Sequence, residues 1–135
     1  MPSNPSHLQP GSAFPPSLIV HAQLSGAKSV VLRLLIDTGA TCTMIPLKAA
    51  MATGCDPSLS TRRLPVITAS AVEYPAIVTI PRLNCLGQRF VNVDVVCHDL
   101  PPQSAVDGLL GLNVLMHLLP FHRFIHSIRT HLVNI

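Results

Sequence analysis

One short run of residues could supply an acid–base catalyst: Asp37-Thr38-Gly39-Ala40, which directly follows the apolar stretch 34–36. A carboxylate at the end of a buried strand is partly removed from water, so its proton affinity depends strongly on neighbouring charges. Thr38 can hydrogen-bond the backbone and fix the turn, and Gly39 permits close backbone approach. Two such turns facing each other would place two carboxylates where they share one proton. One carboxylate could then activate a water while the other polarises a carbonyl.

Alternation of apolar and polar residues predicts the strands that must hold this turn. Residues 18–24 alternate and indicate a half-buried strand, and 29–36 indicate a returning strand buried on both faces. Residues 41–45 are expected to be extended again. A short helix is predicted over 46–53, because a proline suits the first helical turn and Gly54 can close the helix.

The second half of the chain also favours β structure. Two strands, 62–70 and 72–80, are separated by so little that they predict a hairpin. Alternating valines over 91–95 indicate a further strand, and a loop is expected over 99–107. Asn113 is predicted to cap a short helix that ends near residue 119, and the last segment, 121–135, is predicted to form a hairpin. The fold class is therefore all-β, with a closed or barrel-like sheet and one or two short helices.

These motifs, in this order, make the sequence resemble the retropepsin-like aspartic peptidases over roughly residues 18–135. The resemblance rests on LIDTGA at 35–40, on a hairpin in the position of the family's flap, entered through Thr68-Ala69-Ser70, and on LLGLNVL at 109–115. An Asp-Thr-Gly turn alone is also an ordinary way to end a strand. The later Leu-Leu-Gly favours the catalytic interpretation, because in the family this segment packs beside the catalytic turn.

The resemblance implies an aspartic endopeptidase in which Asp37 is the catalytic carboxylate. Thr38 would bond across a dimer axis to its mate, and Gly39, with Ala40 completing the turn, would place backbone near substrate. Three residues of the later segment are expected to pack behind the site: Leu109, Leu110 and Gly111. The chain has no second Asp-Thr-Gly. Two carboxylates therefore require two chains, and a C2 homodimer with Asp37 on its axis is expected. The substrate would be a peptide or protein, with neither a metal nor an organic cofactor.

The sequence departs from the viral members of this family at two places. Those members often carry an acid just after the turn and an Arg after the later Gly, which pair; here the positions hold Thr41 and Leu112. The flap tip usually has Gly, which is absent from the run 70–74, so a stiffer or differently shaped flap is expected. Four residues of this run are candidates for substrate contact: Ser70, Ala71, Val72 and Tyr74. Tyr74 could equally pack outward as a strand residue.

Composition limits the other function classes. The 135 residues fit one domain, and only 11% of them are charged, which suggests that an oligomer interface covers part of the surface. The Lys and Arg residues are scattered and aromatic residues are few, so nucleic-acid binding is not expected. Four Cys lack the spacing of a zinc site and are predicted to be free, buried thiols.

Residues 1–17 are rich in Pro and Ser and are expected to be a flexible arm ahead of a domain over 18–135. They lack the charged start and apolar core of a signal peptide. No apolar stretch is long enough to span a bilayer. A cytoplasmic protein without a membrane partner is therefore expected.

Two other functions remain compatible with the same sequence. One is a catalytically silent, dimeric peptide-binding module of the same fold, and the other is a structural or assembly domain. Asp37→Asn separates catalysis from binding, because it would abolish an activity in the first case and only alter binding in the second. A monomeric chain would count against the enzyme, because a lone Asp37 cannot share a proton with a second carboxylate.

Overall fold

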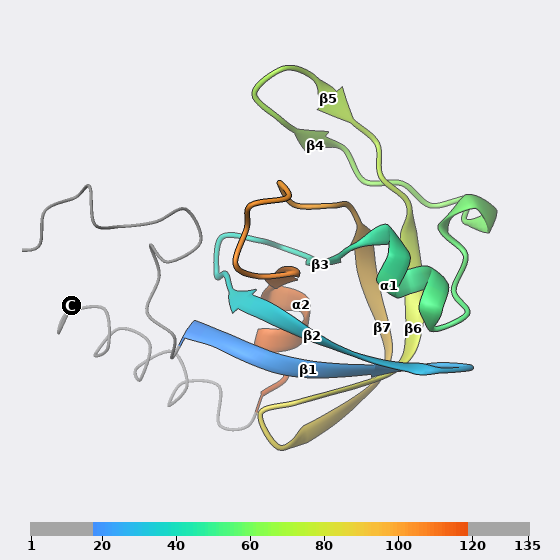
Figure 1. Cartoon of the computed structure of the whole chain (residues 1–135), viewed down its shortest axis with the longest axis vertical. Helices are drawn as coiled ribbons and strands as arrows, with labels where there is room; N and C mark the ends of the chain where they lie inside the picture. Colours follow the sequence, from blue (N-terminus) through green and yellow to red (C-terminus); the bar gives the residue numbers. More distant parts are fainter. Residues whose placement is uncertain (1–17, 119–135) are drawn as a thin grey trace, which may run out of the picture.

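A closed six-stranded barrel forms the body of the computed structural model, which describes residues 18–118 (Figure 1). Neighbouring strands around the barrel follow the order β1-β2-β8-β3-β7-β6, and β6 closes the circle on β1. The strand bounds are β1 (Ile19–Ser25), β2 (Ser29–Ile36), β3 (Thr43–Ile45), β6 (Ile77–Cys85), β7 (Gln88–Cys97) and β8 (Gly108–Leu110). The predicted all-β, barrel-like fold class is confirmed.

Short turns explain the two antiparallel hairpins of the barrel. β1 and β2 pair from Ile19 opposite Leu35 to Ser25 opposite Ser29. β6 and β7 are joined at Leu86 and Gly87, both of which have positive φ. A two-residue turn with two positive φ angles matches the right-handed twist of the strands that it joins. The alternating segments of the sequence are therefore strands that pair with their neighbours through short turns.

Two parallel pairings bring distant parts of the sequence side by side. Residues Leu34, Leu35 and Ile36 of β2 pair with β8, and the whole of β3 pairs with the end of β7. A single antiparallel pair, Met44 with Leu109, connects β3 to β8. As a result, the chain that leaves β2 at Asp37 emerges beside the chain that leaves β8.

Apolar side chains from all parts of the barrel fill its interior. Leu24, Leu34, Ile80 and Leu110 are fully buried, and burial of each such side chain stabilises the fold by about 1.5–3 kcal/mol. β2 alternates, however: Leu34 is buried, whereas Val31 is 62% exposed. The prediction that this strand is buried on both faces is wrong, because its outer face is open to solvent in the single chain.

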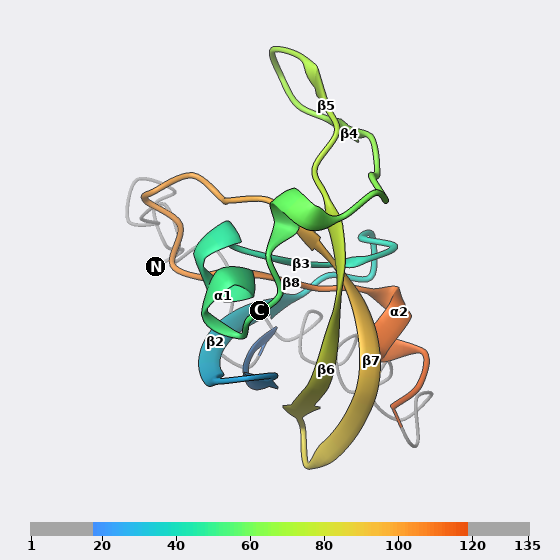
Figure 2. The ribbon, with the colours of Figure 1, turned by 90° about the vertical axis from the view of Figure 1, so that its right-hand side faces the viewer.

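Two short helices lie on opposite sides of the barrel (Figure 2). α1 (Leu47–Ala52) occupies the predicted segment, and Gly54 follows it with φ +89, a conformation that glycine adopts without strain. A 3₁₀ turn, η3 (Pro57–Leu59), comes next. α2 (Leu112–Leu115) is shorter than predicted and begins after Gly111. No helix within residues 18–118 is long and apolar enough to cross a membrane.

A separate two-stranded hairpin projects from the barrel (Figure 1). Its strands are β4 (Val66–Ile67) and β5 (Val72–Glu73). The predicted long strands 62–70 and 72–80 are therefore wrong in their extent. Pro65 and Pro75 lie beside β4 and β5, and proline cannot donate a ladder hydrogen bond. The N-terminal arm and the hairpin predicted over 121–135 lie outside the described residues.

Candidate active site

Asp37 begins a tight turn at the end of β2. Its backbone N donates to the Leu110 carbonyl at 3.0 Å, which extends the pairing of β2 with β8 by one step. Its Oδ1 accepts from the Gly39 N at 2.8 Å, and its carbonyl accepts from the Ala40 N at 3.2 Å. Asp37 is half-buried, whereas Thr38 and Gly39 are exposed. The turn thus holds a carboxylate at the molecular surface in a defined orientation.

The segment after β8 supports this turn from behind. The Leu112 N donates to the Ala40 carbonyl at 2.8 Å, and the Asn113 N donates to the Thr41 carbonyl at 3.1 Å. Leu110 is fully buried beneath the turn, whereas Leu109 is only partly buried. Backbone bonds at Thr41 and Leu112 therefore join the turn to the segment after β8.

Gly111 lies against the backbone of the segment that follows the turn. A Cβ at this position would lie 2.6 Å from the carbonyl carbon of Cys42 and 2.8 Å from the Thr43 N. Both distances are far below van der Waals contact. The Gly111 N donates to the Thr43 Oγ1 at 3.0 Å. Only glycine lets the two segments approach this closely.

Asn113 supports the segment after the turn instead of capping a helix. Its Oδ1 accepts from the N and the Oγ1 of Thr43 at 2.8 and 2.9 Å, and its Nδ2 donates to the Asp94 carbonyl at 2.7 Å. The prediction that it caps α2 is wrong, because Gly111 occupies the N-cap. A lone amide inside the apolar run LLGLNVL was the available signal, since a polar group buried among apolar residues needs partners.

Asn113→Ala should lower the free energy of unfolding by about 2–4 kcal/mol. It removes three hydrogen bonds and leaves the buried Thr43 hydroxyl and amide without their acceptor. Chemical denaturation monitored by circular dichroism measures the change. Asn84→Ala, on β6, is the matched control and should cost less than about 0.5 kcal/mol. Equal losses in the two variants would contradict the supporting role of Asn113.

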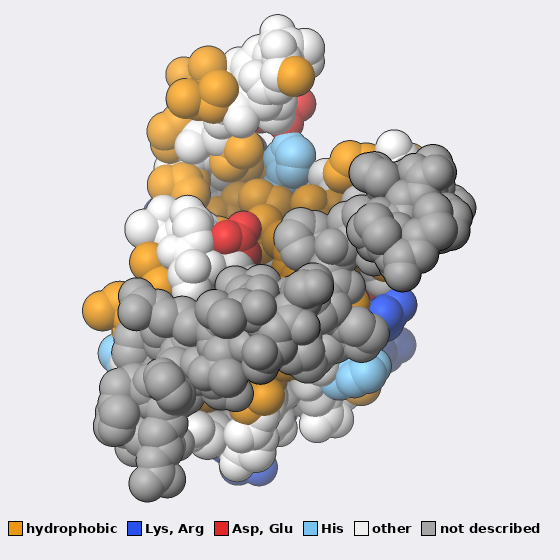
Figure 3. Space-filling view, turned by 90° about the vertical axis from the view of Figure 1, so that its left-hand side faces the viewer, with side chains coloured by type: hydrophobic (Ala, Val, Ile, Leu, Met, Phe, Trp, Pro, Cys, Tyr) orange, Lys and Arg blue, Asp and Glu red, His pale blue; other side chains and the backbone are white. Residues whose placement is uncertain are grey.

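A cleft of about 910 Å³ lies between the projecting hairpin and the barrel. Figure 3 shows that hydrophobic side chains form the bottom of the hollow beneath the hairpin. Of the predicted flap contacts, Ser70 and Tyr74 line this cleft, whereas Ala71 and Val72 do not. Tyr74 is 61% exposed. In the described single chain, the Asp37 turn, residues 37–40, contributes no lining side chain to the cleft.

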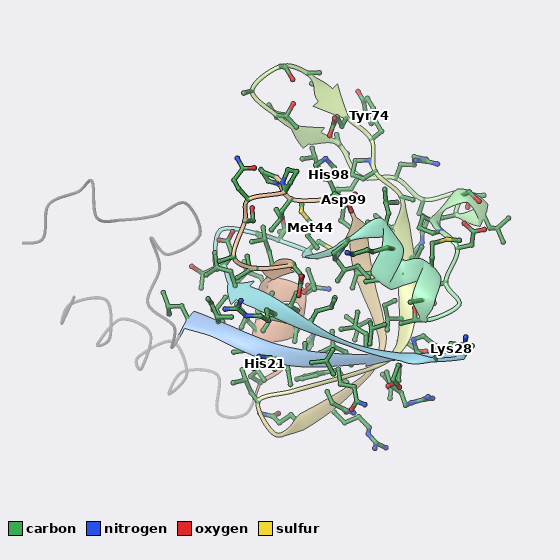
Figure 4. The ribbon with its side chains drawn as sticks, viewed as in Figure 1. His21, Lys28, Met44, Tyr74, His98 and Asp99 are labelled. Carbon is green, nitrogen blue, oxygen red and sulfur yellow. The ribbon has the colours of Figure 1, made fainter. Side chains whose placement is uncertain are left out.

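Polar contacts hold the hairpin in place over this cleft. The Glu73 carboxylate on β5 forms a hydrogen bond with the ring of His98, which follows β7 on the opposite wall. Figure 4 shows His98 beneath the hairpin that carries Tyr74. The Arg63 Nη1 donates to the Tyr74 carbonyl at 3.0 Å, and the Thr68 N donates to the Ala71 carbonyl at 2.8 Å across the tip. The hairpin thus has its own turn and a contact with the barrel.

Burial makes three of the thiols poor nucleophiles. Burial and then the charge of Asp94 raise the pKa of Cys42, which follows the Asp37 turn in the chain. Burial raises the pKa values of Cys85 and Cys97 to about 11. All three side chains are therefore protonated thiols at neutral pH, and only the thiolate is a strong nucleophile. No group of three or more His, Cys, Asp or Glu side chains within residues 18–118 could hold a metal ion.

A family model described as aspartyl protease matches residues 20–114, which include the turn, the hairpin and the segment behind the turn. The chain belongs to the aspartyl protease family. It is also similar to the crystal structure of a retropepsin-like aspartic protease from Rickettsia conorii. That likeness has a TM-score of 0.58 at 22% identity and covers 74% of this chain and 78% of the other. The fold is therefore retropepsin-like, as the sequence predicted. No curated protein matches the chain at a significant level.

Proposed function

We propose that this aspartyl protease family member is an active endopeptidase whose catalytic centre forms between two copies of the chain. The observation that carries the proposal is the Asp37 turn, which presents one carboxylate at the surface and is fastened from behind through Leu110 and Leu112. One carboxylate cannot be both acid and base in the same step. A second copy related by a two-fold axis supplies the other.

The chemistry follows from the shared proton. Two Asp37 carboxylates a few ångströms apart cannot both ionise easily, so one is protonated while the other is charged. The charged carboxylate takes a proton from a water, and the oxygen of that water forms a bond to the scissile carbonyl carbon. The protonated carboxylate polarises the carbonyl oxygen. Collapse of the tetrahedral intermediate breaks the C–N bond, and the amine nitrogen leaves with a proton from the dyad.

The cleft beneath the hairpin is the proposed path of the substrate. It is walled by backbone and mainly apolar side chains, among them Leu47, Pro75 and Leu100. An extended peptide there could form backbone hydrogen bonds with the hairpin, as an added strand does at a sheet edge. Thr38 is proposed to bond to its mate across the axis, and Ser70 and Tyr74 are the flap residues placed to contact the peptide.

Peptide cleavage by the full chain tests this function. The protein is incubated with a diverse peptide mixture at a series of pH values from about 3 to 7, because a carboxylate dyad is active only while it holds one shared proton. New termini are read by mass spectrometry. Cuts made by the wild type and absent from Asp37→Asn support the endopeptidase. Absence of cuts from a dimer shown by sedimentation would contradict catalysis and favour a peptide-binding module of the same fold.

A further inference from the structure

The projecting hairpin joins the barrel at Arg62. The Ile77 N, at the start of β6, donates to the Arg62 carbonyl at 2.9 Å. Arg63 bridges to Ala76, and the Leu64 N donates to the Pro75 carbonyl at 3.1 Å. These rungs form the root of the hairpin, and the direction in which the hairpin projects depends on how Arg62 and its neighbours are held.

The Arg62 side chain is held on two barrel strands by a fork of hydrogen bonds. Its Nη1 and Nη2 each donate at 2.9 Å to one carboxylate oxygen of Asp94 on β7. Its Nη2 also donates at 2.9 Å to the Thr79 Oγ1 on β6, and that hydroxyl donates to Asp94 at 2.7 Å. A bidentate guanidinium–carboxylate pair specifies direction as well as distance, which a single point charge cannot do.

The pair is charged at neutral pH. Arg62 and then Thr79 lower the pKa of the Asp94 carboxyl, since both hydrogen-bond to it. About half of each charged side chain is nevertheless exposed, 50% for Arg62 and 47% for Asp94. Exposed ion pairs contribute little to global stability because water screens them. The fork is therefore better placed to orient the hairpin than to stabilise the barrel.

The backbone of Asp94 is tied to the support of the catalytic turn. Its carbonyl accepts from the Asn113 Nδ2 at 2.7 Å, and Asn113 binds Thr43, whose hydroxyl accepts from the Gly111 N. Asp94 thus contacts the root of the hairpin through its side chain and the segment behind Asp37 through its carbonyl. One residue of β7 therefore connects these two parts directly.

We propose that Arg62 and Asp94 form a brace that sets the position of the hairpin relative to the catalytic turn. Both are positioning residues, because neither contacts the Asp37 carboxylate. The role of the brace in catalysis rests on the proposed function, because a peptidase needs its flap at a defined distance from the two carboxylates. The mechanical role does not depend on catalysis and can be measured separately.

Three variants of the full chain test the brace: Arg62→Gln, Asp94→Asn and the double variant. Asp94→Asn keeps the backbone carbonyl that Asn113 uses, so the support of the turn should survive. Arg82→Gln is the matched control, because Arg82 is an exposed arginine of β6 that reaches the Gly26 carbonyl only at a long 3.5 Å. Amide hydrogen exchange and peptide-cleavage kinetics are measured for all four variants and the wild type.

Loss of the brace should accelerate exchange at the amides of Leu64 and Ile77, which form the root, by about fivefold. Exchange at Thr68, whose bond is local to the tip, and at the amides of β2 should match the control. The double variant should exchange no faster than either single one, because both changes remove one interaction. KM should rise about fivefold while kcat changes less than twofold, as expected when substrate is held less well before the chemical step.

Root amides that exchange at the rate of the Arg82→Gln control would overturn the brace. Equal acceleration of every amide, including those of β2, would also overturn it, because the pair would then be a general stabiliser. A fall in kcat with KM unchanged would overturn the positioning role. If the wild type cleaves no peptide, the proposed function fails, and the exchange measurement alone decides whether the brace exists.

Discussion

Asp37→Asn should abolish peptide cleavage and leave the barrel folded. In a homodimer the change removes both carboxylates, and general acid–base catalysis contributes about 10²–10⁴-fold to rates, so kcat should fall by at least about 10³-fold. The fold should persist because an asparagine Oδ1 can still accept from the Gly39 N, the bond that shapes the turn. The measurement is kcat on a peptide that the wild type cleaves, together with the thermal unfolding midpoint of both proteins.

Asp56→Asn is the control for this variant. Asp56 is an aspartate of the described chain away from the turn, and its Oδ1 accepts from the Ser58 N at 2.9 Å in a local cap. Asparagine caps a helix start about as well as aspartate. The kcat should therefore stay within a factor of two of wild type, and the thermal unfolding midpoint should be close to that of wild type. Cleavage by Asp37→Asn at a tenth or more of the wild-type rate would exclude Asp37 as the catalytic carboxylate.

Mixed dimers test whether the catalytic centre needs two chains. When a fixed amount of wild type is equilibrated with a tenfold excess of Asp37→Asn, most wild-type chains pair with the variant, and activity should drop to roughly a tenth by mass action. The same excess of Asp56→Asn should raise activity instead. Unchanged activity in the presence of the Asp37 variant would show that a single chain is sufficient, which contradicts the two-chain centre.

Local patterns are enough to predict much of the barrel. Alternation locates β1 and β7, and the proline before α1 and Gly54 after it mark the helix ends. Both signals act within a few residues, so they are readable without knowledge of the tertiary fold. The Asp37 turn can be predicted in the same way, because the apolar strand and the Asp-Thr-Gly that ends it are adjacent in the chain.

Features that depend on distant contacts cannot be derived in this way. The parallel pairing of β2 with β8 joins segments separated by most of the domain. Asn113 and Thr43 are 70 positions apart, and neither shows locally that it will bind the other. Local preference favours Asn113 as a helix cap, because Asn often occupies that position. The tertiary contact with Thr43 outweighs this preference, and Gly111 is the N-cap instead.

Gly111→Ala should unfold the domain or lower its free energy of unfolding by about 3 kcal/mol or more. The new Cβ would lie 2.6 Å from the Cys42 carbonyl carbon and 2.8 Å from the Thr43 N, both of them backbone atoms. Overpacking usually costs about 1–3 kcal/mol when side chains can shift. Here the Thr43 backbone is fastened by its bond to Asn113. Relief of the clash would therefore displace the segment that holds Asp37.

Gly87→Ala separates this clash from the general effect of replacing a glycine. Gly87 has φ +73, and a Cβ added there would meet nothing within 4 Å, so alanine costs only the left-handed conformation, about 1–2 kcal/mol. The denaturant concentration at the unfolding midpoint should therefore be much lower for Gly111→Ala than for Gly87→Ala. This order is expected even though Gly111 has an ordinary φ of −96. The reverse order would mean that the segment behind Asp37 can move aside. In that case close packing against Gly111 would not be what holds the Asp37 turn.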